Sequence, residues 1–227
     1  MKRGALGVKE RQVREREAVA RSILDAARDL FVAEGYHNVS IRKIAERIEY
    51  SPAAIYSYFP SKDDIFFALA EEGFHLLFAG VPPNDDDGDT LEGLRRPFWR
   101  VYEFSKSHPE YFALMFVDRT VPRINKDWER FGFVHAMKAR IGARIQRAID
   151  AGIFPAGSQP DVIARILLTT TFGASICRLC QRGAPNEDVD ALVRDTLEAT
   201  LTGLRSGSPT TFVPAEHSPE KKQIVEE

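Results

Sequence analysis

The sequence predicts an all-α protein with a small N-terminal three-helix domain and a larger helical C-terminal domain. Apolar residues recur at helical spacing between breaks rich in Gly and Pro, and no segment alternates apolar and polar residues as a half-buried strand would. Between residues 40 and 62, two very short helices follow one another across a tight turn. Helices this short are not stable alone, so they require a third helix to close a core.

The first short helix begins after Ser40, whose hydroxyl is a suitable N-cap. Its apolar face consists of Ile41, Ile44, Ala45 and Ile48, which recur three and four residues apart. The following pair, Glu49-Tyr50, interrupts this face and predicts the turn.

The second short helix begins at Ser51-Pro52, with Ser as N-cap and Pro at the first helical position, where its missing N–H costs nothing. Ile55 and Phe59 lie four residues apart and are expected to pack on the first helix. The side chains left on the other side are Ala53, Ala54, Ser57 and Tyr58.

The third helix lies upstream and is predicted to end at Gly35, a residue suited to a left-handed C-cap. Its apolar residues are Ile23, Leu24, Ala27, Leu30 and Phe31. Residues 16–62 therefore predict a three-helix DNA-binding unit of helix-turn-helix type.

These residues resemble the N-terminal domain of the TetR family of transcriptional repressors. The resemblance rests on the run Ile23-Leu24-Asp25-Ala26-Ala27, then Leu30-Phe31, Glu34-Gly35-Tyr36, Val39-Ser40-Ile41-Arg42-Lys43-Ile44-Ala45, Ser51 and Ile55-Tyr56-Ser57-Tyr58-Phe59-Pro60-Ser61-Lys62-Asp63. It implies an all-helical homodimer with a diverged ligand-binding C-terminal domain. Two positions depart from the pattern: Glu49 replaces the usual turn Gly, which implies a left-handed non-Gly residue, and Ser40 replaces the usual Thr.

The resemblance also implies roles at the DNA surface. Ser40 and Tyr56 match phosphate-binding positions, and Lys62 matches a basic residue that grips the DNA backbone. Arg42 could reach phosphate or a base edge, and the methyl groups of Ala53 and Ala54 suit contact with thymine methyls. Tyr56 could instead be a core tyrosine, and Arg42 a solvated charge. The complete predicted DNA-binding set is Ser40, Arg42, Lys43, Ser51, Pro52, Ala53, Ala54, Tyr56, Ser57, Tyr58 and Lys62.

Composition predicts a cytoplasmic protein, and the distribution of charge separates the two ends of the chain. Its 227 residues show neither a membrane-length apolar run nor a secretory-signal pattern, and two cysteines without a disulfide framework indicate a reducing compartment. Residues 1–62 contain 12 Lys and Arg against 8 Asp and Glu, whereas residues 63–227 contain 19 against 25. We expect four segments: a basic flexible arm (1–15), the DNA-binding domain (16–62), an effector-binding and dimerisation domain (63–205) and a disordered tail (206–227). The basic arm could reach DNA, or it could be merely solvated.

The C-terminal domain is predicted to contain a linking helix from Lys62 to about Gly80, followed by helices over about 90–106, 109–118, 127–151, 161–182 and 187–205. The segment 82–89 is acidic and rich in Pro, which predicts a loop without the spacing of a calcium site. The last two helices are apolar over more than one stripe and predict a homodimer interface, with an intramolecular core as the alternative.

Aromatic residues gather between positions 98 and 133 and suit a pocket for a hydrophobic or aromatic effector, although aromatics at helical spacing also form ordinary cores. The predicted ligand-binding set is Phe98, Trp99, Tyr102, Tyr111, Phe112, Phe116, Trp128, Phe131 and His135. Cys177 and Cys180 form a C-x-x-C pair without further ligands, so both are expected to be buried, and no metal or cofactor is predicted.

No nucleophile elbow, phosphate loop or metalloprotease pattern indicates an enzyme. The sequence therefore predicts a homodimeric DNA-binding regulator, a repressor released from a palindromic double-stranded operator by a small hydrophobic molecule. The alternative is a DNA-binding structural protein without an effector, whose C-terminal domain serves only dimerisation or partner binding.

Overall fold

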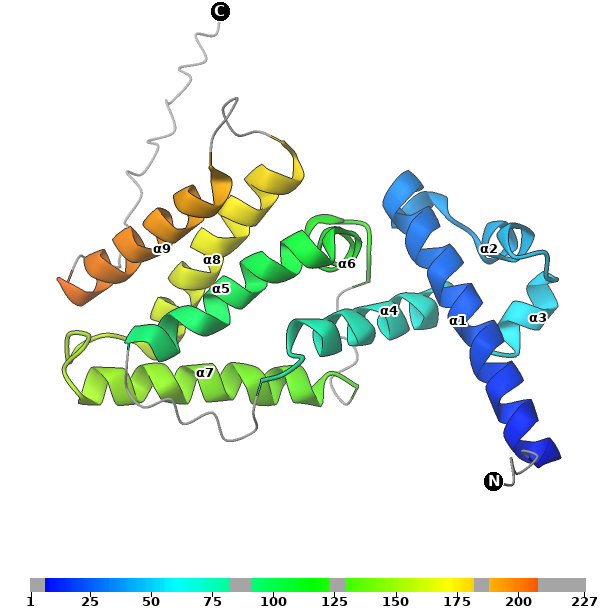
Figure 1. Ribbon diagram of the computed structural model, residues 1–227, viewed down its shortest axis with the longest axis horizontal. Helices are drawn as coiled ribbons and strands as arrows, with labels where there is room; N and C mark the ends of the chain where they lie inside the picture. Colours follow the sequence, from blue (N-terminus) through cyan, green and yellow to red (C-terminus); the bar gives the residue numbers. More distant parts are fainter. Residues whose placement is uncertain (1–6, 82–90, 123–129, 182–187, 208–227) are drawn as a thin grey trace, which may run out of the picture.

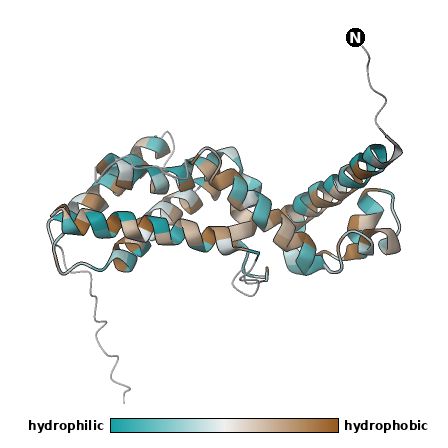
Figure 2. Cartoon of the chain, turned by 90° about the horizontal axis from the view of Figure 1, so that it is seen from below, coloured by the Kyte–Doolittle hydropathy of each residue, from teal (hydrophilic) through white to brown (hydrophobic). Residues whose placement is uncertain are grey.

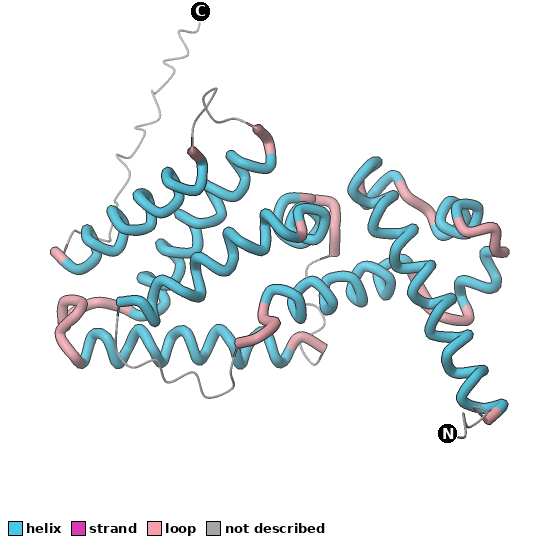
Figure 3. Tube along the Cα trace, in the orientation of Figure 1, coloured by secondary structure: helices cyan, strands magenta, loops and turns pink. Residues whose placement is uncertain are grey.

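The computed structural model describes residues 7–81, 91–122, 130–181 and 188–207. The described chain folds into helices joined by short loops, as Figure 3 shows, and contains no strand within those ranges. This confirms the predicted all-α class. Trp128, the segment 82–90 and the tail from residue 208 lie outside the described residues.

The N-terminal domain consists of α1 (Val8–Glu34), the 3₁₀ turn η1 (Tyr36–Asn38), α2 (Ile41–Arg47) and α3 (Pro52–Tyr56). The long α1 runs beside the two short helices (Figure 1). It ends as expected, because Gly35 takes a φ of 81° and its N–H donates to the carbonyl of Phe31. The expectation of a flexible arm over residues 1–15 is wrong for residues 8–15, because these residues already belong to α1.

Helix α4 (Lys62–Leu77) leads from the N-terminal domain into the C-terminal domain (Figure 1). Its buried residues belong to one apolar cluster that also includes Ile23 and Ile44 of the N-terminal domain and Phe112 and Phe131 of the C-terminal domain. The two domains therefore share a continuous core, and residue 62 marks a change of function rather than a break in packing.

The C-terminal domain contains α5 (Leu91–Ser107), α6 (Pro109–Phe112), the π-helical turn η2 (Ala113–Val117), α7 (Gly132–Asp150), α8 (Pro160–Leu179) and α9 (Val189–Arg205). Helix α8 packs against α5, α7 and α9. In Figure 2, where the cartoon is coloured by residue hydropathy, hydrophilic and hydrophobic residues alternate along the helices. A second apolar cluster, separate from the first, lies between these four helices.

Helix α5 continues through a proline. Pro97 has no N–H to donate to the carbonyl of Gly93, four residues earlier, so that carbonyl loses its helical partner. Arg144 of α7 replaces it, with Nη1 2.7 Å from the carbonyl oxygen of Gly93. A contact between two helices thus satisfies a defect within one of them.

By length and composition, α8 could cross a membrane, and within the described ranges it is the only helix of this kind. Core helices of folded domains pass the same test. Helix α8 packs against three neighbouring helices, yet only 22% of its apolar window is buried within the described chain.

Candidate DNA-binding surface and effector cleft

The short helices α2 and α3 begin at side-chain caps. The hydroxyl of Ser40 accepts from the N–H of Lys43 at 3.2 Å, and that of Ser51 accepts from the N–H of Ala54 at 3.1 Å. Between them, Glu49 adopts a φ of 59°, the left-handed conformation expected for its turn position. These local features present the start of α3 with its first residues outward.

Several predicted DNA-binding side chains lie on one exposed surface formed by α2 and α3. Tyr56 is 54% exposed, which rules out the core alternative for this tyrosine. The side chain of Arg42 is 81% exposed and pairs with Glu46 at 3.0 Å. We define the reading surface by the exposed residues Ser40, Arg42, Ser51, Pro52, Ala53, Tyr56 and Ser57, with Ala54 half-buried beside them.

Lys43 and Lys62 do not extend freely from this surface. Lys43 forms an ion pair with Glu34 of α1. Lys62 points inward: its Nζ donates to the carbonyls of Tyr36 and Val39, both at 2.9 Å, and lies 4.1 Å from the centre of the Tyr36 ring. Burial lowers the pKa of Lys62. The sequence resemblance implied that Lys62 contacts the DNA backbone. In this structure, Lys62 instead binds the turn before α2.

Arg16 of α1 also holds the end of α3 in place. Its Nη2 donates to the carbonyl of Ser57 at 3.2 Å, and its guanidinium lies 5.2 Å from the centre of the Tyr58 ring. Tyr58 is consequently half-buried beneath Arg16 and is less available to bases than predicted. Only the fold could show this contact, because 41 residues separate Arg16 from Ser57.

The turn between α1 and α2 is also held by the C-terminal domain. The N–H of Tyr36 donates to Oδ2 of Asp118 at 3.1 Å, and Asp118 follows η2 directly. Burial alone would raise the pKa of Asp118, but hydrogen bonds from Thr120 and from Tyr36 outweigh it and lower that pKa. The phenol of Tyr36 donates to Asp63, and burial together with this bond raises the pKa of Tyr36.

Most of the predicted ligand-binding aromatics are core residues in this structure. Phe98 and Tyr102 are 3% and 0% exposed, and Tyr111, Phe112 and Phe131 are likewise buried. The rings of Phe112 and Phe116 contact each other and Phe172 of α8 in tilted and edge-to-face arrangements, with ring centres 5.0 to 5.9 Å apart. The aromatic cluster thus fills the space between α4, η2, α7 and α8. His135 is half-buried on α7 and Trp128 lies outside the described residues.

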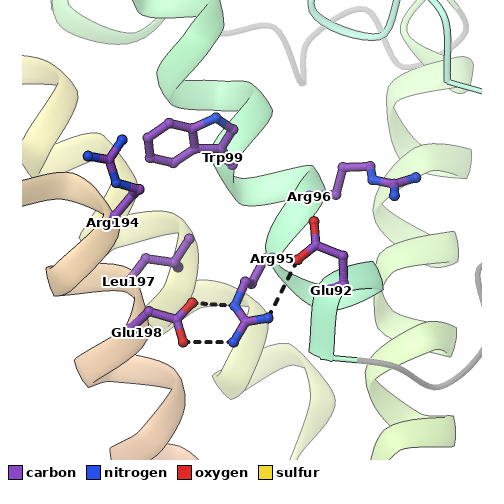
Figure 4. A pocket seen from close by; sticks show the side chains of 7 residues that line it. All are labelled: Glu92, Arg95, Arg96, Trp99, Arg194, Leu197 and Glu198. Carbon is purple, nitrogen blue, oxygen red and sulfur yellow. Dashed lines mark hydrogen bonds and ion pairs between the residues drawn. The ribbon is translucent and has the colours of Figure 1, made fainter. Parts of the chain in front are cut away.

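One predicted ligand residue, Trp99, does line a cleft. This cleft has a volume of about 280 Å³ and lies between α5 and α9, as Figure 4 shows. We call it the α5–α9 cleft, and it is lined by Glu92, Arg95, Arg96, Trp99, Arg194, Leu197 and Glu198. The sequence reading missed its polar members, although Arg95, Trp99, Tyr102 and Lys106 recur at spacings of four, three and four and so share one face of α5.

Helices α8 and α9 leave a row of apolar and small residues exposed. Ile176 is 37% exposed and Leu192 is 42% exposed. Cys177 and Cys180 are also exposed, so the expectation that both are buried is wrong for the single chain. The other exposed small residues of this row are Thr169, Gly173, Thr196 and Ala199. No group of three or more His, Cys, Asp or Glu residues in the described ranges is arranged to hold a metal ion.

The sequence comparisons agree with this geometry. Residues 23–69, which span the end of α1 to the first half of α4, match the family model described as "Bacterial regulatory proteins, tetR family". Residues 23–69 thus form a DNA-binding domain of the TetR type. The match covers the elements that build the reading surface, so the helix-turn-helix here is the DNA-binding unit of a family of transcriptional regulators.

Curated proteins that resemble this chain match it over part of their length. The nucleoid occlusion factor SlmA of Vibrio campbellii is 34% identical over 105 residues, which cover 43% of this chain and 54% of SlmA. The transcriptional repressor Rv1474c of Mycobacterium tuberculosis is 44% identical over 59 residues, which cover 26% of this chain and 32% of that protein. The chain thus spans about half or less of the length of these relatives.

A solved structure extends the likeness to the C-terminal domain. The regulator FadR of Bacillus subtilis, solved in complex with stearoyl-CoA, is 16% identical to this chain, with a TM-score of 0.65 over 81% of this chain and 98% of FadR. At this identity the likeness concerns the fold alone. It shows that the helical domain after α4 has an arrangement known among regulators.

Proposed function

We propose that this chain is a TetR-family transcriptional repressor that binds a palindromic DNA operator as a homodimer and is released by a small molecule. The observation that supports this most directly is the reading surface, in which α3 buries Ile55 completely and turns Ala53 and Tyr56 outward. Two short helices held in this way match the geometry in which a second helix enters the major groove while the first crosses the backbone.

The charged groups near the reading surface are held by pairs that DNA can displace. Arg42 and Glu46 form an exposed pair four residues apart on α2. Such exposed pairs contribute about 0–1 kcal/mol, so a phosphate can take the guanidinium at little cost. Tyr56 offers an exposed hydroxyl to a phosphate, and the methyl groups of Ala53 and Ala54 favour thymine at the matching positions.

The exposed row on α8 and α9 supports the homodimer. Large apolar side chains such as Ile176 and Leu192 lie in this row beside small residues that allow two helices to approach closely. Pairing the row with its copy would give a twofold axis, and twofold symmetry allows two reading surfaces to contact half-sites one DNA turn apart, about 34–36 Å.

Two connections can transmit a change in the C-terminal domain to the reading surface. The first is α4 itself, whose Gly73 lies against η2 so closely that an added Cβ would be 2.2 Å from Sδ of Met115. The second is the hydrogen bond from the N–H of Tyr36 to Asp118. Because both pass through η2, a movement of η2 would shift the start of α2, and effector and operator would then weaken each other's binding reciprocally.

Selection of bound sequences from a pool of random DNA duplexes tests this proposal. We expect the wild-type chain to enrich a palindrome with half-sites one turn apart and thymine opposite Ala53 and Ala54. Arg42→Ala and Tyr56→Phe should weaken the enrichment, whereas Arg205→Ala, an exposed arginine at the end of α9, should not. Salt-sensitive binding with no enriched sequence would contradict the proposal.

The structural alternative, a DNA-binding protein without an effector, predicts the same selection result but no response to small molecules. The α5–α9 cleft favours the regulated form, because it offers a place for a ligand outside the DNA-binding domain. Release of the selected duplex by a small molecule separates the two functions.

A further inference from the structure

We propose that the α5–α9 cleft is the effector site and that it binds a small aromatic monocarboxylate. This inference rests on the proposed function, since it names the class of molecule that would release the operator. It is carried by the arrangement of charged and aromatic side chains along α5 and α9, two helices that are about 100 residues apart in sequence.

Two rows of side chains face each other across the cleft and join at both ends. At one end, Nη2 of Arg95 lies 2.8 Å from Oε2 of Glu198. At the other end, the hydroxyl of Tyr102 donates to Oδ1 of Asp190 at 2.6 Å, and Nζ of Lys106 donates to Oδ2 at 2.5 Å. These bonds fix the separation of α5 and α9, so the space between them is preformed.

Charge within the cleft favours a single negative charge. Its lining contains three arginines and two glutamates, a net charge of +1. Arg95 is already neutralised by both oxygens of Glu198 and by Glu92, as Figure 4 shows. Arg194 lies at the end of the cleft away from that network, beside Trp99 (Figure 4). A guanidinium matches a carboxylate with two parallel hydrogen bonds, so Arg194 is the group we assign to the anion.

Apolar groups next to Arg194 favour a flat ligand. The indole of Trp99 is held in place, because its Nε1 donates to Glu103 at 3.0 Å and its ring lies 5.2 Å from that of Tyr102. Leu197 adds an aliphatic side chain to the same lining. An aromatic ring can stack on the indole while its carboxylate reaches Arg194.

Size and charge also disfavour other effectors. The volume of about 280 Å³ lies just below the range for small-molecule sites, about 300–1,000 Å³, so only a small ligand fits. A coenzyme A ester is far larger than this volume and carries several negative charges, more than a net charge of +1 can balance. Arg194 interacts electrostatically with Asp190, and a carboxylate ligand would compete with Asp190 for its guanidinium. The cleft therefore selects a small ring with one carboxylate.

Calorimetric titration of the full chain tests the site directly. Benzoate and 2-naphthoate are the expected ligands, with benzamide and 2-naphthamide as uncharged matches, cyclohexanecarboxylate as a non-aromatic acid and stearoyl-CoA as a multiply charged ligand. We expect saturable binding of at least one aromatic acid and affinity at least about tenfold weaker for its amide, since charged hydrogen bonds are the strong ones.

Arg194→Gln should lower the affinity for the aromatic acid at least about tenfold. Arg205→Gln is the matched control, because it removes an exposed arginine from the same helix about 16 Å away along its axis. Circular dichroism of both variants should match the wild type. Equal affinity in wild type and Arg194→Gln, or no saturable binding of either aromatic acid, would overturn the site assignment.

The effect on DNA separates this inference from the proposed function. The same acid should release the selected duplex from the wild-type chain but not from Arg194→Gln. Binding of the acid without any release would overturn its role as effector. If the chain selects no duplex when no ligand is present, the proposed function fails, whereas selective DNA binding with no response to any aromatic acid overturns this inference alone.

Discussion

The helices of the reading surface and those of the C-terminal domain are stabilised in different ways. Helices α2 and α3 have seven and five residues, and each begins at a serine whose hydroxyl accepts a backbone N–H. In the C-terminal domain, α7 and α8 have 19 and 20 residues and begin without a side-chain cap, whereas α9 begins at Asp188, whose carboxylate accepts the N–H of Ala191. Short helices gain little from propagation, so their caps matter, whereas long amphipathic helices draw their stability from packing. The starts of α2 and α3 are therefore encoded locally, whereas α7 and α8 depend on distant contacts.

Removal of a core aromatic should give the largest effect in this comparison. Phe112→Ala empties a site that is 0% exposed and should reduce the free energy of unfolding by about 3–5 kcal/mol. Tyr56→Ala, in the reading surface, should change it by less than about 0.5 kcal/mol because Tyr56 is exposed. Urea unfolding followed by circular dichroism at one fixed protein concentration measures both, and comparable losses in the two variants would contradict the contrast.

Overfilling the junction between α4 and η2 should have the next largest effect. Gly73→Val adds atoms where a Cβ alone would lie 2.2 Å from Sδ of Met115, and we expect a loss of about 1–3 kcal/mol in the free energy of unfolding. Gly142→Ala on α7 is the matched control. Nothing lies within 4 Å of its Cβ, so it should stabilise the chain by about 0.5–1 kcal/mol. If both variants changed the free energy of unfolding in the same direction, the close approach of α4 and η2 at Gly73 would be disproved.

The caps of the short helices should contribute about 1 kcal/mol each. Ser51→Ala removes the acceptor of the Ala54 N–H, and we expect faster hydrogen exchange at the amides of α3 together with this loss of stability. Ser51→Thr keeps a hydroxyl and should behave nearly as the wild type. Unchanged exchange in Ser51→Ala would show that tertiary packing alone holds α3.

Acid should weaken the link between η2 and the turn before α2 by a smaller amount. The pKa of Asp118 is lowered in the folded chain from its ordinary value of 3.8. Its contribution to stability, less than about 1 kcal/mol, is therefore fully present above pH 3.8 and is lost as the pH falls through the lowered pKa. Asp118→Asn should remove this part of the acid dependence. If the free energy of unfolding depended on pH in the same way in wild type and variant, the claim that a charged Asp118 stabilises this link would be refuted.

Sequence patterns predicted the local features of the N-terminal domain well. The caps at Ser40 and Ser51, the C-cap at Gly35 and the left-handed Glu49 all depend on residues within a few positions of one another. The inward position of Lys62 could not be predicted, because its partners, the carbonyls of Tyr36 and Val39, lie 26 and 23 residues away, and its contact with phosphate stays a prediction.

The ligand-binding region could not be predicted in the same way. Aromatic residues at helical spacing read alike whether they fill a core, as Phe112 does, or line a cleft, as Trp99 does. The cleft depends on Arg95 meeting Glu198 across 103 positions of sequence, a pairing that only the packing of α5 and α9 on α8 creates. The exposure of Cys177 likewise follows from which face of α8 its neighbours cover.

The most direct test of the reading surface is the affinity of Tyr56→Ala for the selected duplex, measured by fluorescence anisotropy beside its urea unfolding curve. Tyr56 is exposed and contributes to no core, so we predict at least about tenfold weaker DNA binding with unchanged stability. Wild-type affinity in the variant would contradict the assignment of the α2–α3 surface as the part of the molecule that contacts DNA.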